Sequence, residues 1–148
     1  MITQPFSIKQ IVEQTRMNSE KNEELIGCDR ETGLFEFRVV MLSTGRQTGN
    51  SNRIEAAFNP ATDLYVTRDQ LSIDMFADRF TQPIHYLNLN SRKLDDFIRG
   101  LASLRLETVY IDLGVSMFFK SRNLVHHLIR AYDEQAEELG FKPVFVIT

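Results

Sequence analysis

Several residue types are scarce in this chain, and their scarcity excludes whole classes of protein. The 148 residues include one cysteine, no tryptophan and only four prolines. A single cysteine excludes an internal disulfide and suits a reducing compartment. Cys28 has no histidine near it in the sequence, so we interpret it as a small buried hydrophobe rather than a catalytic thiol. The chain is therefore neither a disulfide scaffold nor a candidate thiol enzyme.

Long hydrophobic runs are also missing. No apolar stretch approaches the ~20 residues that a membrane-spanning helix needs. The first ten residues, up to Gln10, are polar and lack the apolar centre of a signal peptide. We therefore expect a cytoplasmic protein with no membrane association.

Charge of one sign does not dominate the composition. There are 17 basic and 20 acidic residues, which gives a net charge of −3. This balance does not support nucleic acid as a partner, although it leaves room for a local basic patch. Hydrophobic residues make up 43% and charged residues 25%, as in an ordinary globular domain. A chain of this length buries enough surface to fold without a metal or cofactor.

Strand-like and helix-like patterns alternate along the chain. Ser7 and Gln10 have the spacing of a capping box at the start of an N-terminal helix. The later apolar patterns predict, in order, a strand at 35–42, a short helix to 58, a strand at 64–66, a helix at 71–80, a strand at 84–89, a helix at 91–104, a strand at 109–111, a helix at 124–139 and a strand at 144–147.

Five strands that alternate with helices predict an α/β fold with three layers. We expect a mostly parallel five-stranded sheet with helices on both faces, preceded by an N-terminal helix. Residues 1–33 form the N-terminal helix and an acidic turn in this scheme, and 34–148 form the α/β domain, within one compact unit. Ligands of such sheets bind at the carboxyl ends of the strands, so the loops there are the candidate functional segments.

The loop after the first predicted strand is polar and contains two glycines. A strand, a glycine-containing loop and a helix start together form a phosphate cradle, because backbone amides then face the anion. The loop resembles the Walker A motif of P-loop NTPases, most closely in viral DNA-packaging motors (terminase large subunits) and helicase lobes of the RecA-like type. The resemblance implies a nucleotide- or phosphate-binding role for Thr44, Gly45, Arg46, Gln47, Thr48, Gly49, Asn50 and Ser51. An ordinary strand-to-helix turn is the alternative interpretation.

Three further segments extend the resemblance to the rest of the chain. Residues 64–70 resemble the second conserved segment of those motors, and 108–112 resemble Walker B. The family pattern implies that Asp112 and Ser51 hold the Mg²⁺ of a bound ATP. It also implies that Thr148, after the last strand, senses the γ-phosphate or couples the motor. Asp112 could instead simply cap the turn that follows its strand.

Two positions depart from the family pattern. Asn50 stands where the motif has a lysine that contacts the phosphates, and Leu113 stands where active relatives have a glutamate that polarises water. We therefore expect poor hydrolysis or none. One hypothesis is a degenerate ATPase-like module that still binds a nucleotide or phosphate. The other is a pseudo-ATPase, of viral origin if the resemblance holds, that binds no nucleotide and acts through a protein partner or a homo-oligomer. Both fit a chain that ends directly after the last motif.

A basic segment follows Asp112. We interpret residues 114–123 as a loop that presents Lys120 and Arg122 to a phosphate or a partner; ordinary solvated charges are the alternative. The predicted last helix is basic at its start and acidic at its end, which opposes the helix dipole. His126 and His127 lie about 100° apart on a helix, so we assign them no metal.

Overall fold

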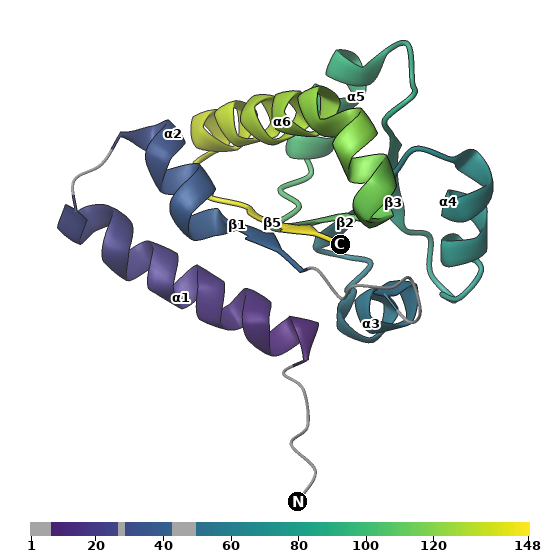
Figure 1. The fold of residues 1–148 in the computed structure, drawn as a ribbon, viewed down its shortest axis with the longest axis horizontal. Helices are drawn as coiled ribbons and strands as arrows, with labels where there is room; N and C mark the ends of the chain where they lie inside the picture. Colours follow the sequence, from purple (N-terminus) through teal and green to yellow (C-terminus); the bar gives the residue numbers. More distant parts are fainter. Residues whose placement is uncertain (1–6, 27–28, 43–49) are drawn as a thin grey trace, which may run out of the picture.

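The computed structural model describes the backbone of residues 7–26, 29–42 and 50–148. It has three layers, with a five-stranded sheet in the middle and helices on both faces (Figure 1). The elements are α1 (Ile8–Ile26), α2 (Arg30–Gly33), η1 (Leu34–Arg38, a π-helical turn), β1 (Val39–Met41), α3 (Asn50–Ala57), β2 (Asp63–Thr67), α4 (Gln70–Ala77), β3 (His85–Asn88), α5 (Leu94–Ala102), β4 (Thr108–Ile111), α6 (Gly114–Leu139) and β5 (Val144–Ile147).

The sheet is parallel throughout, with strand order β1-β5-β4-β2-β3. The expected α/β fold with a five-stranded sheet is therefore confirmed. β2, β4 and β5 are buried at every residue, as expected for strands covered on both faces. β1 and β3 are the two edge strands.

Two apolar clusters fill the space between the layers. One lies between the sheet and α5 and α6, and the other lies between the sheet and α1, α3 and α4. Alternation along each strand sends successive side chains into opposite clusters: Val109 and Ile111 face α5 and α6, whereas Tyr110 faces α3 and α4. Ile8 and Val12 of α1 belong to the second cluster, so the N-terminal helix is part of the same packed unit.

Local sequence signals fix several element ends. The Ser7 amide donates to Gln10 Oε1 at 3.1 Å and the Gln10 amide donates to Ser7 Oγ at 3.2 Å, which is the predicted capping box. Gly140 ends α6 with φ of +83°, a left-handed conformation that glycine adopts without strain. α3 ends just before Phe58, as predicted from the Asn-Pro pair that follows.

The structure corrects the predicted boundaries of three elements. The first strand covers only Val39–Met41, because Phe35 and Phe37 lie in η1 and Phe35 packs against His126 of α6, with 5.5 Å between ring centroids. Ser91 does not cap α5, which begins at Leu94 without a side-chain cap. Helix α6 begins at Gly114, so the predicted loop at 114–123 is helical.

Candidate carboxyl-edge site

All five strands end at one edge of the sheet because they are parallel. From β1 across the sheet, this carboxyl edge carries Leu42, then Thr148, Asp112, Arg68 and finally Asn90 beyond β3. The structure thus brings the predicted Walker B position and the predicted sensor position to neighbouring strands. β5 lies between β1 and β4, so Thr148 lies between Leu42 and Asp112.

Asp112 is the centre of a hydrogen-bond network at this edge. The Tyr65 hydroxyl donates to its Oδ2 at 2.7 Å, and the Thr148 hydroxyl donates to its Oδ1 at 3.1 Å. The Tyr65 ring stacks on Phe76 of α4 with 3.9 Å between centroids, which holds the hydroxyl in place. Two strands and one helix therefore fix the direction of this half-buried carboxylate.

The backbone around Asp112 is fixed as well. The Asp112 amide donates to the Val66 carbonyl at 2.8 Å, and the amides of Leu113 and Gly114 donate to the Thr148 carbonyl at 3.1 and 2.9 Å. The start of α6 is thus tied to the end of β5. Leu113 is half-buried and packs against the cluster beneath α5 and α6.

Most of the Walker A-like segment lies outside the described residues: Thr44 to Gly49, together with the side chains of Asn50 and Ser51. The backbone of Asn50 begins α3, with Ser51 in its first turn. Ile54 and Phe58 place α3 on the sheet face that also carries the side chain of Tyr110. Asp112 and Thr148 follow the alternation of β4 and β5, so their side chains emerge at the edge of this same face.

The structure changes the interpretation of Lys120 and Arg122. Both side chains are exposed, but they lie inside α6, in its second and third turns, and not at a helix start. The predicted clash between basic residues and the helix dipole at this end is therefore wrong, because the dipole acts mainly within the first turn.

Burial, together with Arg130 and Arg122, lowers the pKa of His126.

A cavity of about 380 Å³ opens on the β2 side of Asp112. Its polar lining includes Arg68, Asp69 and Arg79, and its apolar lining includes Met75 and Met117. We did not single out Tyr65 or Arg68 as site residues from sequence. One sequence signal could have identified Tyr65. It lies two residues before the end of β2, and strand alternation puts its side chain on the same face of the sheet as that of Tyr110.

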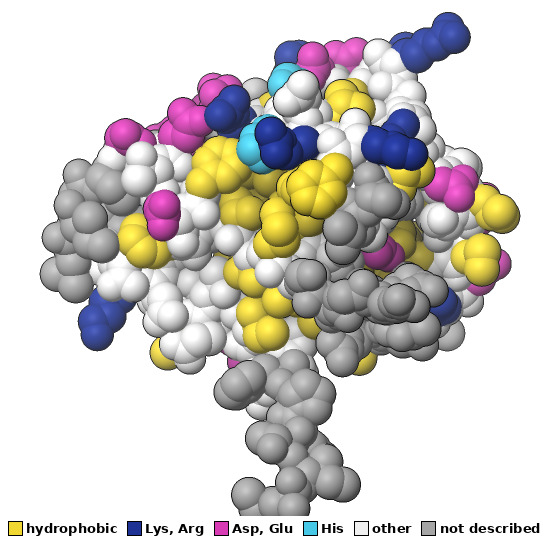
Figure 2. Space-filling view, viewed as in Figure 1, with side chains coloured by type: hydrophobic (Ala, Val, Ile, Leu, Met, Phe, Trp, Pro, Cys, Tyr) yellow, Lys and Arg dark blue, Asp and Glu magenta, His cyan; other side chains and the backbone are white. Residues whose placement is uncertain are grey.

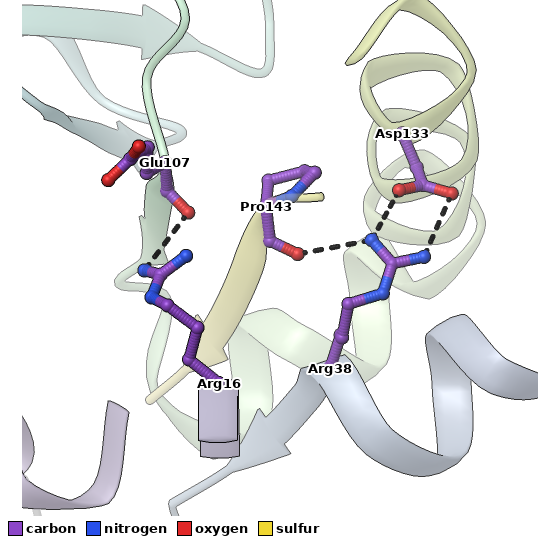
Figure 3. Close-up of polar contacts among 5 residues, drawn as sticks. All are labelled: Arg16, Arg38, Glu107, Asp133 and Pro143. Carbon is purple, nitrogen blue, oxygen red and sulfur yellow. Dashed lines mark hydrogen bonds and ion pairs between the residues drawn. The ribbon is translucent and has the colours of Figure 1, made fainter. Parts of the chain in front are cut away.

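The opposite, amino edge of the sheet also carries polar residues, but they are paired with each other (Figure 3). Arg38 binds both carboxylate oxygens of Asp133, at 2.6 and 3.3 Å, and donates to the Pro143 carbonyl at 3.3 Å. Both side chains of this ion pair are at most 2% exposed. Arg16 of α1 donates to the Glu107 carbonyl at 3.5 Å and to Thr108 Oγ1 at 3.0 Å.

Burial changes the acid–base behaviour of two residues near this amino edge. It raises the pKa of Asp63 even though the carboxylate accepts hydrogen bonds from the Asn59 amide and the Thr62 hydroxyl. It also raises the pKa of Tyr110, which the nearby Asp63 carboxylate raises further. Asp63 is the first residue of β2, so it lies at the opposite edge of the sheet from the cavity and supports the fold there.

Among the residues that the structure describes, no three side chains of histidine, cysteine, aspartate or glutamate are grouped so that they could hold a metal ion. No described helix is both long enough and apolar enough to cross a bilayer.

Comparison with known proteins adds no relative: no family model, curated protein or solved structure matches the chain.

Proposed function

We propose that the chain is a degenerate P-loop ATPase-like module that binds a nucleotide at the carboxyl edge of its sheet and hydrolyses it poorly or not at all. The observation that carries this proposal is the Tyr65–Asp112–Thr148 network, a half-buried carboxylate held by two hydroxyls at the end of a buried strand. Buried strands with polar side chains at their carboxyl ends are the usual place for a ligand in an open α/β sheet.

The path of the chain supports a phosphate group near Asp112. α3 ends near the amino edge, because the Asn59 amide, two residues after the helix, donates to Asp63 at the start of β2. We therefore expect the first amides of α3 to lie toward the carboxyl edge, where Asp112 and Thr148 emerge. The first amides of a helix attract anions, because they carry partial positive charge and lack intrahelical partners. α3 and the two side chains also share one face of the sheet.

The residues suit a Mg²⁺ ion only when it arrives with a nucleotide. Mg²⁺ is commonly held by one or two carboxylates together with phosphate oxygens and water, and it does not need a full protein cage. Asp112 is the carboxylate present, and a Mg²⁺ ion there would replace one of the contacts that its oxygens make now, such as a hydroxyl hydrogen bond. Bound there, the ion would neutralise phosphate charge.

Hydrolysis is expected to be weak for a local reason. Leu113 occupies the position after Asp112 and packs its side chain against the apolar cluster. It cannot polarise a water molecule, and the loss of a general base typically lowers a rate by about 10²–10⁴-fold.

Thermal unfolding with and without nucleotide tests the proposal. A ligand at about 100 times its Kd stabilises a protein by ~2.7 kcal/mol. We expect millimolar ADP or ATP with Mg²⁺ to raise the Tm of the wild type and of Glu134→Gln, an exposed carboxylate on α6. Asp112→Asn should lose this shift; it keeps the shape, because one hydroxyl partner can still donate to the amide oxygen and the other can accept from the amide NH2. No shift in the wild type contradicts nucleotide binding, and an unchanged shift in Asp112→Asn contradicts this site.

A second test adds the missing charge. Asn50→Lys places an ammonium at the start of α3, and a charge-assisted hydrogen bond of ~1.5–3 kcal/mol corresponds to about 10–100-fold tighter binding. Asn52→Lys adds the same charge two residues later on α3 and serves as the matched control. Equal affinities of the two variants in calorimetry would contradict a phosphate site at the beginning of α3.

A protein-interaction role is the second candidate, and one surface feature favours it. Phe119 is 65% exposed on α6, beside the exposed Lys120, and Met117 and Leu124 are also exposed. Figure 2 shows a band of hydrophobic side chains that descends from α6 across the β1 side of the molecule. Exposed apolar patches of this kind mark interaction surfaces. Sedimentation of the wild type and Phe119→Ser tests self-association: a wild-type monomer at high concentration contradicts a homo-oligomer built on this surface.

A further inference from the structure

The cavity beside Asp112 has features that the proposed nucleotide site does not use. Its walls come from the end of β2, from α4 and the turn after it, and from the start of α6. Two arginines contribute to the lining: Arg68 directly follows β2, and Arg79 follows α4. A cavity of about 380 Å³ is within the usual range for small-molecule pockets.

Arg68 is held by two neutral partners. Its Nη1 donates to Ser121 Oγ of α6 at 2.9 Å, and its Nη2 donates to Asn90 Oδ1 at 3.4 Å. The second contact is long and contributes little. The Nε–H of Arg68 is buried and has no hydrogen-bond acceptor. A buried donor without an acceptor is rare in native proteins and calls for an explanation.

Three other charged side chains line the cavity: Asp69, Arg79 and Asp112. Asp69 directs both carboxylate oxygens to the first turn of α4, where Oδ1 accepts from the Leu71 amide and Oδ2 from the Ser72 hydroxyl, each at 3.0 Å. Arg79 pairs with Glu55 at 3.4 Å, and both side chains are about one third exposed. An exposed ion pair of this length contributes little, so Glu55 by itself does not hold Arg79 in place.

We propose that this cavity is an oxyanion subsite in which Arg68 and Arg79 hold a phosphate group. When phosphate binds, Nε and Nη2 of Arg68 donate two parallel hydrogen bonds to phosphate oxygens. Nη2 gives up its long contact to Asn90 to do so. This arrangement gives the buried Nε–H the acceptor that it lacks. The class of ligand, a phosphate compound, rests on the proposed function, whereas the residues of the subsite do not.

Inorganic pyrophosphate without Mg²⁺ is the probe, because it needs neither Asp112 nor a bound metal. We expect calorimetry to show binding to the wild type and to Arg92→Gln, which removes an exposed arginine from the loop before α5. Arg68→Gln and Arg79→Gln should each bind about 10–100-fold more weakly, as expected for the loss of a charge-assisted hydrogen bond. Equal affinity of Arg68→Gln and the wild type would overturn the proposal. Citrate replaces pyrophosphate in a parallel titration; tighter binding of citrate assigns the cavity to carboxylates and overturns the phosphate assignment.

Nuclear magnetic resonance of the unmodified protein gives a readout that does not depend on the folding of a variant. We expect pyrophosphate to shift the Nε–H resonance of Arg68, because that proton acquires an acceptor. An Arg68 resonance that does not move at saturating pyrophosphate overturns the subsite.

The two proposals can fail separately. Nucleotide binding that needs Asp112 and is unchanged in Arg68→Gln refutes the subsite and leaves the nucleotide site intact. Pyrophosphate binding that needs Arg68, in a protein whose Tm does not respond to nucleotide, supports the subsite and refutes the nucleotide site.

Discussion

The two edges of the sheet both carry polar side chains, but these side chains are used in different ways. At the amino edge, Arg38 and Asp133 are almost fully buried and satisfy each other. At the carboxyl edge, Asp112 is only half-buried, it accepts hydrogen bonds from two neutral hydroxyls, and a cavity lies beside it. Charges that are buried and paired support the fold, whereas a half-buried carboxylate beside a cavity lies where a ligand can reach it. The comparison predicts that amino-edge variants mainly lose stability and carboxyl-edge variants mainly lose binding.

The largest effect is expected from breaking the buried ion pair. Asp133→Ala leaves the Arg38 guanidinium without its carboxylate and should lower the free energy of unfolding by ~3–5 kcal/mol in urea denaturation. The double variant Arg38→Met with Asp133→Leu removes both charges and should regain most of that loss. If Asp133→Ala lowers the free energy of unfolding by less than about 1 kcal/mol, the ion pair does not support the fold.

A smaller loss is expected from Tyr132, whose buried hydroxyl donates to the Leu106 carbonyl at 2.7 Å. Tyr132→Phe leaves that carbonyl without its donor and should lower the free energy of unfolding by ~1–3 kcal/mol at neutral pH. Burial raises the pKa of Tyr132, so its contribution is complete below the unfolded value near pH 10 and is lost as the pH rises further. The difference in unfolding free energy between wild type and variant should therefore narrow above about pH 10 in urea denaturation, and a difference that stays constant would contradict a raised pKa.

Asp63 gives a pH-dependent test of the amino edge. Burial raises its pKa above the ordinary 3.8, so the folded protein favours the protonated acid. The stabilisation is complete below the unfolded pKa and is lost as the pH rises through the folded value. The stability of the wild type relative to Asp63→Asn should therefore fall as the pH increases from about 4 in urea titrations. A difference that stays constant over this range would contradict a raised pKa for Asp63.

The smallest change in stability is expected at the carboxyl edge. Tyr65→Phe and Thr148→Val each remove one partly buried hydrogen bond, which is worth ~0.5–1.5 kcal/mol. Both variants should weaken nucleotide binding in calorimetry, because they loosen the orientation of Asp112. If Tyr65→Phe or Thr148→Val loses as much stability as Asp133→Ala and binds nucleotide as the wild type does, the two edges do not differ in their roles.

Sequence patterns predicted the elements that depend on local signals. The strand at 144–147, the capping box at Ser7 and the end of the last helix at Leu139 all follow from neighbouring residues, and each is confirmed. The positions of Asp112 and Thr148 directly after predicted strands then placed them at the carboxyl edge. The hydrogen bond between them could not be predicted, because it depends on which strands are neighbours.

The errors come from contacts between distant segments. Phe35 and Phe37 alternate like strand residues, but Arg38 is drawn to Asp133, 95 residues away, and the segment before β1 is helical. The start of α6 was missed because Ser121, a polar residue, is buried between Phe118 and Val125 and accepts from Arg68. The helix predicted at 71–80 rests on a stripe of Leu71, Met75, Phe76 and Phe80 at helical spacing. Phe76 is buried as expected, but Leu71 and Met75 are exposed, and Ile73, which the stripe leaves out, is buried. Helical spacing alone does not decide which of these side chains faces the sheet.

The central claim is that a nucleotide binds at the carboxyl edge and not at the amino edge. Titration of ¹⁵N-labelled protein with ADP and Mg²⁺, followed by amide resonances, tests it most directly. The account predicts shifts at Asp112, Leu113 and Thr148, with the amides of Glu107 and Val144 unchanged. Shifts confined to Glu107, Val144 and their neighbours, or no shifts at saturating nucleotide, would contradict it.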